Sequence, residues 1–364
     1  MSHDKSVRHV RSVSHSRRTR LEHAKLPFGI RGDGAEPLVP HRSQWVGEPR
    51  YCLHALAVCV LAAAATTHAE SELIPDAPSR CEACAEWNEP QEPFPIFGNT
   101  YYVGTKQLSA ILISTDDGLI LMDAALPQSA PLIDANIRAL GFDTGDIKLI
   151  VTSHTHYDHV GGVAALQRAS GAMVAASPSS AQALREGRPT PDDPQFASKD
   201  NGFPRVADVT VIADGEALTV GDVQITPHFT PGHTPGSTTW TWRSCEQQRC
   251  LNIVYADSLN AVSADGFLFT TATGHSPRID AFRRSIRTIE ALPCDILLSP
   301  HSGFFGMAGK LQRQSEGQSD AFVDPTACRR YAAAASARLD QRIATEREIH
   351  NRSEAAEATR TRRP

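Results

Sequence analysis

A cluster of potential metal ligands constrains this chain more than any other feature. Residues 154–159 read His-Thr-His-Tyr-Asp-His and follow the apolar run 147–152 after a single serine. Imidazole and carboxylate groups bind zinc, and a hydrolytic zinc site needs protein ligands plus an open position for water. Four potential ligands in six residues are too many for one such site. The cluster therefore predicts two metal ions at the end of a strand, with further ligands later in the chain.

Two later histidines occur in the same setting. His233 lies in the segment Thr-Pro-Gly-His-Thr-Pro-Gly and follows the strand-like residues 223–226, whereas His301 follows the run 295–298. Loops that follow strands converge at one edge of a sheet, where sites commonly form. A single histidine is usually a surface or capping residue, but three clusters in this order and context favour a metal centre.

Strand and helix patterns alternate along the chain in two similar halves. Each half has several strands and then a helix, which predicts two sheets packed face to face with helices outside. Asp116-Asp117-Gly118 predicts a hairpin turn. Residues 70–95 are expected to form a loose arm, and the proline-rich residues 186–205 a surface loop near the site. The expected strands are 100–103, 109–114, 119–122, 147–152, 209–212, 223–226, 238–242, 252–255 and 295–298, and the expected helices are 131–140, 161–169, 279–291 and 324–348.

The first 69 residues are predicted to be a leader that export removes. Residues 52–65 are apolar, Arg50 precedes them, and Thr-Thr-His-Ala at 66–69 resembles a signal-peptidase site. A signal peptide starts within about 30 residues of its cleavage site. The start codon is therefore expected to be assigned too early, with Val46 as the true start. Two alternatives for the preceding residues are a weak twin-arginine-like match at 16–18 and a basic arm that binds nucleic acid.

Charge argues against a nucleic-acid partner for the exported chain. The net charge is −5, and residues 1–69 contain ten Lys/Arg and five Asp/Glu, so the remainder carries −10. Such an acidic chain is a poor general binder of nucleic acid. No apolar run is long enough for a convincing membrane span. The exported chain is expected to be a periplasmic monomer with one domain at 70–350 and a disordered tail at 351–364.

These motifs resemble the metallo-β-lactamase superfamily. The pattern His-x-His-x-Asp-His, a later Gly-His and a still later His matches that superfamily, and further stretches are similar to subclass B3 metallo-β-lactamases. The resemblance runs from about residue 87 to about residue 342. It implies a four-layer αβ/βα sandwich with the metals in a groove at one edge of the sheets. The closer matches are 99–105, 153–161, 231–237, 239–242, 255–259 and 294–297.

The resemblance also implies the ligands and the reaction. It assigns three side chains to each of two zinc ions: His154, His156 and His233 to the first, and Asp158, His159 and His301 to the second. A water that bridges two zinc ions loses its proton readily, because each ion stabilises hydroxide. That hydroxide, oriented by Asp158, would attack the β-lactam carbonyl. The implied function is hydrolysis of penicillins, cephalosporins and carbapenems, which gives antibiotic resistance.

Ser258 separates the lactamase interpretation from its alternatives. Many superfamily hydrolases place a bridging Asp after this strand, whereas subclass B3 has a serine, as in Ala-Asp-Ser-Leu at 256–259 here. Ser258 is expected to hydrogen-bond the substrate or water at the second zinc. Asn260 stands where relatives carry a Ser or Thr that binds the substrate carboxylate, and its amide can also donate a hydrogen bond. Gln195 matches a loop residue that faces the substrate, and Asp257 is expected to be a structural carboxylate, with metal ligation as the alternative.

Other notable side chains receive structural roles. His228 is expected to pack within its strand or beside the ligands. His275 lies in a glycine-rich loop and is a candidate for lining the groove. Trp240 and Trp242 alternate with threonines, which suits a strand with one buried apolar face.

Six cysteines remain after the leader, and an even count in an exported chain suggests disulfides. Subclass B3 enzymes pair cysteines spaced like Cys245–Cys250 and Cys294–Cys328, so the resemblance implies these two bonds. Cys81–Cys84 departs from the pattern, because the partner position used in some relatives is Lys106 here. These two cysteines are expected to pair with each other, with a zinc site as the alternative.

Two other functions remain open. A hydrolase of the same fold could act on lactones, thioesters or sulfate esters, but the Asp257-Ser258 arrangement and the cysteine spacing disfavour it. A metal-binding protein without hydrolytic activity is the second alternative. The complete set of six ligands disfavours it, since a decayed site would be expected to lose one.

Overall fold

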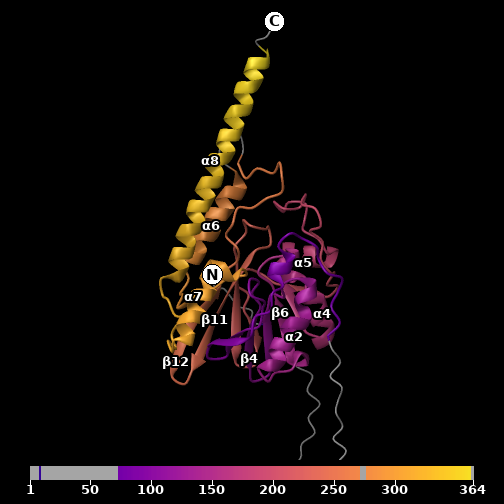
Figure 1. Cartoon of the computed structure of the whole chain (residues 1–364), viewed down its shortest axis with the longest axis vertical. Helices are drawn as coiled ribbons and strands as arrows, with labels where there is room; N and C mark the ends of the chain where they lie inside the picture. The colour runs from indigo at the N-terminus through magenta and orange to yellow at the C-terminus, as the bar shows by residue number, and fades with distance from the viewer. Residues whose placement is uncertain (1–7, 10–72, 271–275, 362–364) are drawn as a thin grey trace, which may run out of the picture. The chain divides into compact units, whose positions relative to one another are not determined.

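Two β-sheets pack face to face, and helices cover their outer faces (Figure 1). The computed structural model describes residues 8–9, 73–270 and 276–361. The order of layers, helices then sheet then sheet then helices, confirms the αβ/βα sandwich expected from the sequence. Most of the expected leader, and also His275, lie outside the described residues.

The seven-stranded sheet comes from the first half of the chain, with the order β2-β3-β4-β5-β6-β7-β8. Its first four strands are antiparallel neighbours and β5 to β8 are parallel. The β4–β5 hairpin turns at the expected place, and Gly118 has φ +128°, a backbone conformation that favours glycine. The strands are β2 (Phe94–Phe97), β3 (Thr100–Tyr102), β4 (Ile111–Thr115), β5 (Gly118–Met122), β6 (Ile147–Val151), β7 (Met173–Ala176) and β8 (Val209–Val211), and the α-helices of this half are α1 (Cys84–Trp87), α2 (Ala130–Ala139), α3 (Tyr157–Val160), α4 (Val163–Ser170) and α5 (Pro178–Glu186).

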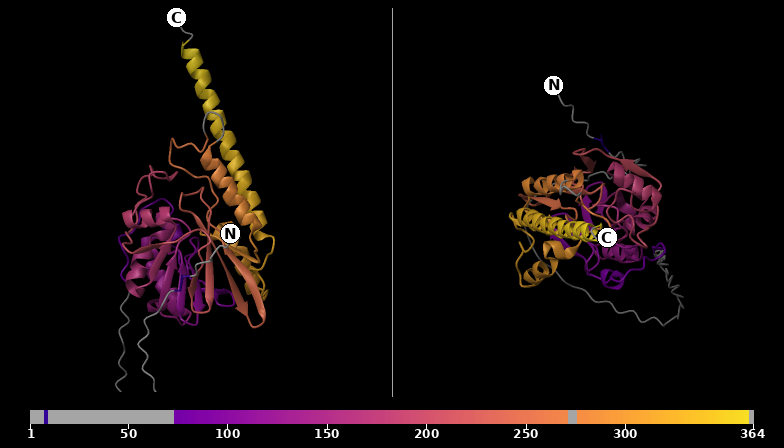
Figure 2. Two further views of the ribbon diagram at one scale, coloured as in Figure 1. Left: turned by 180° about the vertical axis from the view of Figure 1, so that it is seen from behind. Right: turned by 90° about the horizontal axis from the view of Figure 1, so that it is seen from above.

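The six-stranded sheet has the order β1-β9-β10-β11-β12-β13. Strands β9 to β12 are antiparallel neighbours, whereas β13 runs parallel to β12. Helices α6 and α8 lie side by side on this half (Figures 1 and 2). The strands are β1 (Arg8–His9), β9 (Leu218–Val220), β10 (Val223–Phe229), β11 (Thr238–Glu246), β12 (Arg249–Tyr255) and β13 (Ile296–Leu298), and the α-helices are α6 (Pro277–Ala291), α7 (Met307–Ser315) and α8 (Ala327–Thr361).

Strand β5 shows why this sequence forms stacked layers. Its side chains alternate between two cores: Ile120 and Met122 pack between the sheets, and Leu119 and Leu121 pack toward α2 and α4. A strand buried on both faces is a continuous apolar run, as this one is. The core between the sheets also holds Trp240 and Trp242 of β11, which confirms their expected burial.

Several elements differ from the sequence expectations. The expected loose arm at 70–95 contains α1 and the start of β2, and β2 tolerates Pro95 because it is an edge strand. Helix α8 continues to Thr361, through residues expected to be a disordered tail. That segment is rich in Ala, Glu and Arg, which favour helix. The sequence patterns also missed β7, α5, β9 and α7.

Several strand ends meet at one edge of the sandwich. A polar or charged side chain follows within four residues of the end of each of five strands: β5, β6, β10, β12 and β13. None of the helices in the described residues is both long and apolar enough to span a membrane. The edge of the sandwich where the strand ends meet is where a functional site can form, because these polar loops converge there.

Candidate metal centre

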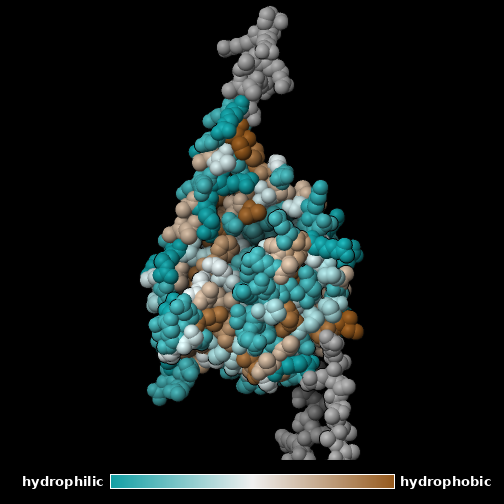
Figure 3. All heavy atoms as spheres, in the orientation of Figure 1, coloured by the Kyte–Doolittle hydropathy of each residue, from teal (hydrophilic) through white to brown (hydrophobic). Residues whose placement is uncertain are grey.

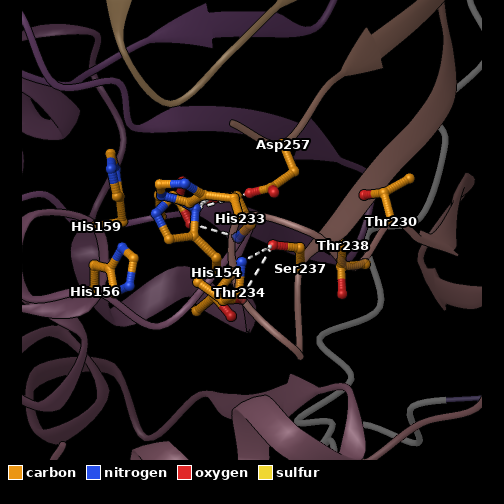
Figure 4. Close-up of polar contacts among 12 residues, drawn as sticks. His154, His156, His159, Thr230, His233, Thr234, Ser237, Thr238 and Asp257 are labelled. Carbon is orange, nitrogen blue, oxygen red and sulfur yellow. Dashed lines mark hydrogen bonds and ion pairs between the residues drawn. The ribbon is translucent and has the colours of Figure 1, made fainter. Parts of the chain in front are cut away.

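The six predicted ligands form two groups at this edge. In each group the potential ligand atoms lie within 4.8 Å of one another. Figure 4 shows the rings of the first group gathered close to His159. The groups bring together loops after β6, β10 and β13, which are far apart in the sequence. Their members are His154, His156 and His233 in the first group, and Asp158, His159 and His301 in the second.

The short helix α3 carries two of these ligands. It begins directly after His156, so Asp158 and His159 lie on one turn beside the first group. Gly161 then allows the chain to pass close to Pro127, since a Cβ at Gly161 would lie 2.4 Å from the Pro127 nitrogen. A larger residue here would push α3 and its ligands away from the edge.

His154 is oriented by a buried carboxylate. Its Nδ1 lies 2.7 Å from Oδ1 of Asp257, and both side chains have no exposed surface. Burial lowers the pKa of His154, so the imidazole is neutral and Nδ1–H donates to the carboxylate. The other ring nitrogen, Nε2, is buried and has no hydrogen-bond partner. A ring held by a carboxylate at one nitrogen, with the other nitrogen aimed inward, is a typical metal ligand.

The other two histidines of the first group are held in a similar way. Nε2 of His156 lies 3.3 Å from the Asp193 carboxylate. Nδ1 of His233 lies 2.8 Å from the backbone oxygen of Asn260, so this nitrogen donates and Nε2 is left for the group. Burial lowers the pKa of His233 to about 3, which keeps its ring neutral at pH 7. Neutral imidazoles are the form that binds metal.

The second group is built around Asp158. Its Oδ2 lies 3.1 Å from Nε2 of His159 and 3.5 Å from Nε2 of His301. Burial alone would raise the pKa of Asp158, but the neighbouring histidines outweigh it and hold that pKa well below its usual value. Burial lowers the pKa of His301 to about 4. Nδ1 of His159 is buried without a hydrogen-bond partner.

These unpartnered nitrogens are the test of whether a metal fits. A buried polar atom without a partner is costly and rare in proteins. Nε2 of His154 and Nδ1 of His159 are two such atoms, and each residue belongs to one of the ligand groups. An imidazole lone pair directed at a cation would remove this cost, so the residues present suit a metal ion in each group.

Comparison with known proteins shows which family the chain belongs to. A family model described as the metallo-β-lactamase superfamily matches residues 103–245. The solved structure of Rm3 metallo-β-lactamase is 51% identical, with a TM-score of 0.71, and the match covers 73% of this chain and 99% of that one. MEM-A1, a subclass B3 metallo-β-lactamase from a soil metagenome library, is 45% identical, with a TM-score of 0.68 and coverage of 71% and 98%. This chain belongs to the subclass B3 metallo-β-lactamases. BJP-1, the subclass B3 enzyme of Bradyrhizobium japonicum, is 32% identical, with a TM-score of 0.67 and coverage of 73% and 99%.

A second buried carboxylate, Asp123, holds the ligand loop of this metallo-β-lactamase in place. Asp123 follows β5 and accepts hydrogen bonds from the backbone nitrogen and hydroxyl of Ser153 and from the hydroxyl of Tyr255, at 2.6–2.7 Å. Its φ of +58° is rare for a residue other than glycine, and these bonds hold it there. Ser153 directly precedes His154, so Asp123 helps to place the ligand loop.

The two ligand groups open into a groove of about 730 Å³. Ser258, Asn260 and Gln195, the three residues expected to contact a substrate, all line this groove. The Ser258 hydroxyl is buried and has no hydrogen-bond partner. Nε2 of Gln195 lies 3.4 Å from Nδ1 of His156, which places this side chain at the boundary between the first group and the groove.

Several contributors to the site were missed or undervalued from the sequence. Asp123 follows a strand, so the rule that located the histidines could also have found it. Asp257 was expected to be structural, and it has the more specific role of orienting His154. Trp87 lies in the expected loose arm, yet it lines the groove with its ring centre 5.6 Å from that of His301. No sequence pattern pointed to Trp87.

The remaining predictions concern residues away from the ligands. His228 belongs to neither group; its Nε2 lies 2.9 Å from the Thr241 hydroxyl, beside a separate groove of about 590 Å³. The cysteines of all three expected pairs lie at disulfide distance: Cys81–Cys84, Cys245–Cys250 and Cys294–Cys328.

Proposed function

We propose that this chain hydrolyses the amide bond of β-lactams with two zinc ions, one in each ligand group. The observation that carries this proposal is the pair of converging groups at the floor of one groove. The rings of the first group are oriented by hydrogen bonds from outside it, so the site is organised by the chain itself. The names of similar solved structures agree with β-lactam hydrolysis.

The side chains of the groove supply the other parts of the reaction. Zinc bound in the two groups would supply an activated water as nucleophile and a Lewis acid for the lactam carbonyl. Asp158 is ionised, so its carboxylate would accept a hydrogen bond from the attacking water and orient it. The unpartnered Ser258 hydroxyl would donate to the substrate, and the amide groups of Asn260 and Gln195 would bind its polar substituents. No side-chain nucleophile is needed.

The position of Asp257 supports this function over lactone or thioester hydrolysis by a relative with a bridging carboxylate. Its Oδ1 is engaged by His154, and it belongs to neither ligand group. A carboxylate held behind a histidine orients that ligand and does not bridge two ions. The residue that faces the groove at this point is Ser258.

Hydrolysis assays with metal control test the proposal. The purified chain without residues 1–69 should hydrolyse a penicillin, a cephalosporin and a carbapenem, lose activity with a chelator and regain it with zinc. Elemental analysis should give about two zinc ions per chain. His233→Ala should abolish activity, whereas His228→Ala, in the same strand-and-loop segment but outside both groups, should retain it. Efficient cleavage of thioesters or lactones with no β-lactam turnover would overturn the proposal, as would full activity with one zinc or none.

We also propose that the enzyme is a periplasmic monomer. Export rests on the apolar segment and cleavage motif of the leader, and N-terminal sequencing of exported protein should begin within a few residues of Glu70. On the face drawn in Figure 3, hydrophobic areas are small and separated by hydrophilic surface. Large contiguous apolar patches mark protein interfaces, so this face favours a monomer. Light scattering of the purified chain tests the oligomeric state.

A further inference from the structure

A row of polar side chains on α8 contacts the chain segment 257–270. Successive members are separated by seven, four and four residues, so they lie along one face of the helix. Together they bond the segment from its start beside the metal centre to its far end. The members are Tyr331, Arg338, Arg342 and Glu346.

The first half of the row holds the part of the segment nearest the ligands. The Tyr331 hydroxyl donates to the backbone oxygen of Asp257 at 2.6 Å and accepts from the backbone nitrogen of Leu259 at 3.0 Å. Nη2 of Arg338 donates to the backbone oxygen of Leu259 at 3.3 Å. These bonds fix the backbone on both sides of Ser258.

The second half of the row forms a charged clamp. Nε of Arg342 donates to Glu346 at 2.5 Å, and its Nη2 donates to the Ser263 hydroxyl at 2.8 Å and to the backbone oxygen of Phe267 at 3.0 Å. The Glu346 carboxylate accepts from the backbone nitrogen of Phe269 at 3.1 Å, and from the backbone nitrogen and hydroxyl of Thr270 at 2.8 Å each. Glu346 is 2% exposed. Hydrogen bonds with ionised partners are the stronger kind, so this clamp holds residues 263–270 against α8.

The clamped segment forms one wall of the substrate groove. Ser258, Asn260 and Val262 all line the groove. Val262 is 41% exposed, so its side chain is available to an apolar part of a ligand. Residue 262 directly precedes the first residue that Arg342 bonds. The position of this wall therefore depends on the clamp.

We propose that Arg342 and Glu346 are positioning residues for substrate binding. They hold residues 263–270, so that Val262, which directly precedes the held residues, presents a preformed wall to the substrate. Neither belongs to a ligand group or lines the groove, so they act through the segment and not on the metal centre. The inference rests on the proposed function for its substrate. Releasing the clamp leaves the metal centre intact but forces the substrate to order a loose wall, which weakens binding more than turnover.

Kinetic and proteolytic measurements on the metal-loaded enzyme test this inference. Arg342→Ala and Glu346→Ala should each raise KM for a β-lactam about 5- to 20-fold, the loss expected for charge-assisted hydrogen bonds. The value of kcat should stay within about twofold, and zinc content should be unchanged. Arg342→Lys keeps the charge but not the planar fork, so it should recover part of the loss. Arg347→Ala and Glu348→Ala, exposed on the same helix, are the matched controls and should behave as the parent.

Ser263→Ala provides a variant whose folding is not at risk, because it removes one clamp bond from a partly exposed residue. It should raise KM about two- to threefold in the parent and have no effect in Arg342→Ala. Proteolytic cleavage between residues 261 and 270 should become faster in the clamp variants. Unchanged KM and unchanged cleavage in all of them would overturn the inference. If the parent cleaves no β-lactam, the proposed function fails, and cleavage of the segment alone still decides whether the clamp holds it.

Discussion

Nδ1 of His154 lies 2.7 Å from Oδ1 of Asp257, and both side chains are fully buried. This pair ties the first ligand loop to the end of β12, on the other sheet. Removing the carboxylate would free the His154 ring and leave its Nδ1–H without an acceptor. Partners of this kind typically contribute 10- to 100-fold in metal affinity.

We therefore predict that Asp257→Ala lowers zinc affinity of the first group about 10- to 100-fold while the fold is retained. Competition with a chromophoric chelator measures this affinity. Asp265→Ala, an exposed carboxylate on the following loop, is the control and should bind zinc as the parent does. Parent-like zinc affinity in Asp257→Ala would show that the pair does not orient the ligand.

Ser258 and Asp158 should respond very differently to removal. Ser258→Ala takes one hydroxyl from the groove, so we expect both zinc ions to remain and kcat/KM for β-lactams to fall about tenfold at most. Asp158→Ala removes a ligand and the group that orients water, so zinc content should fall to about one per chain and activity should be lost. The measurements are zinc content and kcat/KM for both variants. A loss of zinc from Ser258→Ala would contradict this assignment of roles.

The sequence predicted the site better than it predicted the elements around it. The six candidate ligands could be found because chemistry restricts metal ligands to few residue types and because each candidate follows a strand-like run. Their partners are harder to find, since Asp123, Asp193 and Asp257 are ordinary carboxylates until the fold places them within hydrogen-bond distance of a serine or histidine.

The missed elements have physical reasons too. Strand β7 reads Met-Val-Ala-Ala, and alanine is depleted in strands, so its sequence gives little strand signal. The strand β2 contains Pro95, which normally argues against a strand and is tolerated here at a sheet edge. Tertiary packing brings Trp87 to the groove. Its neighbours in the sequence do not distinguish it from a surface residue, so its position could not be predicted.

The pair Cys294–Cys328 should stabilise the fold by joining the chain just before β13 to the start of α8. Its sulfur atoms are separated by 34 residues of sequence, and the chain-entropy model gives about 3–4 kcal/mol for such a loop. We predict that Cys328→Ser lowers the unfolding midpoint under oxidising conditions and leaves zinc content largely intact. Cys294→Ser should have an effect of similar size, and the double variant should add little. Free thiols at both positions in the parent, found by mass mapping, would contradict the bond.

Lys310 should make stability depend on pH in the alkaline range. Lys310 lies in α7 and is 7% exposed, and its ammonium group donates to the backbone oxygen of Phe322 at 3.2 Å. Burial lowers its pKa to about 8, against an ordinary value of 10.5 in the unfolded chain, although Asp324 partly opposes the shift. Between these values the unfolded chain binds more protons than the folded one, so the contribution of Lys310 to stability rises with pH.

Comparison with Lys310→Met isolates this contribution, because other titrating groups are shared and largely cancel. The free energy of unfolding of the parent minus that of the variant should increase from pH 8 to pH 10.5 and be flat below about pH 7. One pKa unit corresponds to about 1.4 kcal/mol, so the total change should be about 3.5 kcal/mol at most. Urea unfolding at a series of pH values measures the difference, and the exposed Lys199→Met serves as the control. A difference that is constant with pH, or that falls as pH rises, would show that Lys310 keeps its proton equally well in the folded and unfolded chain.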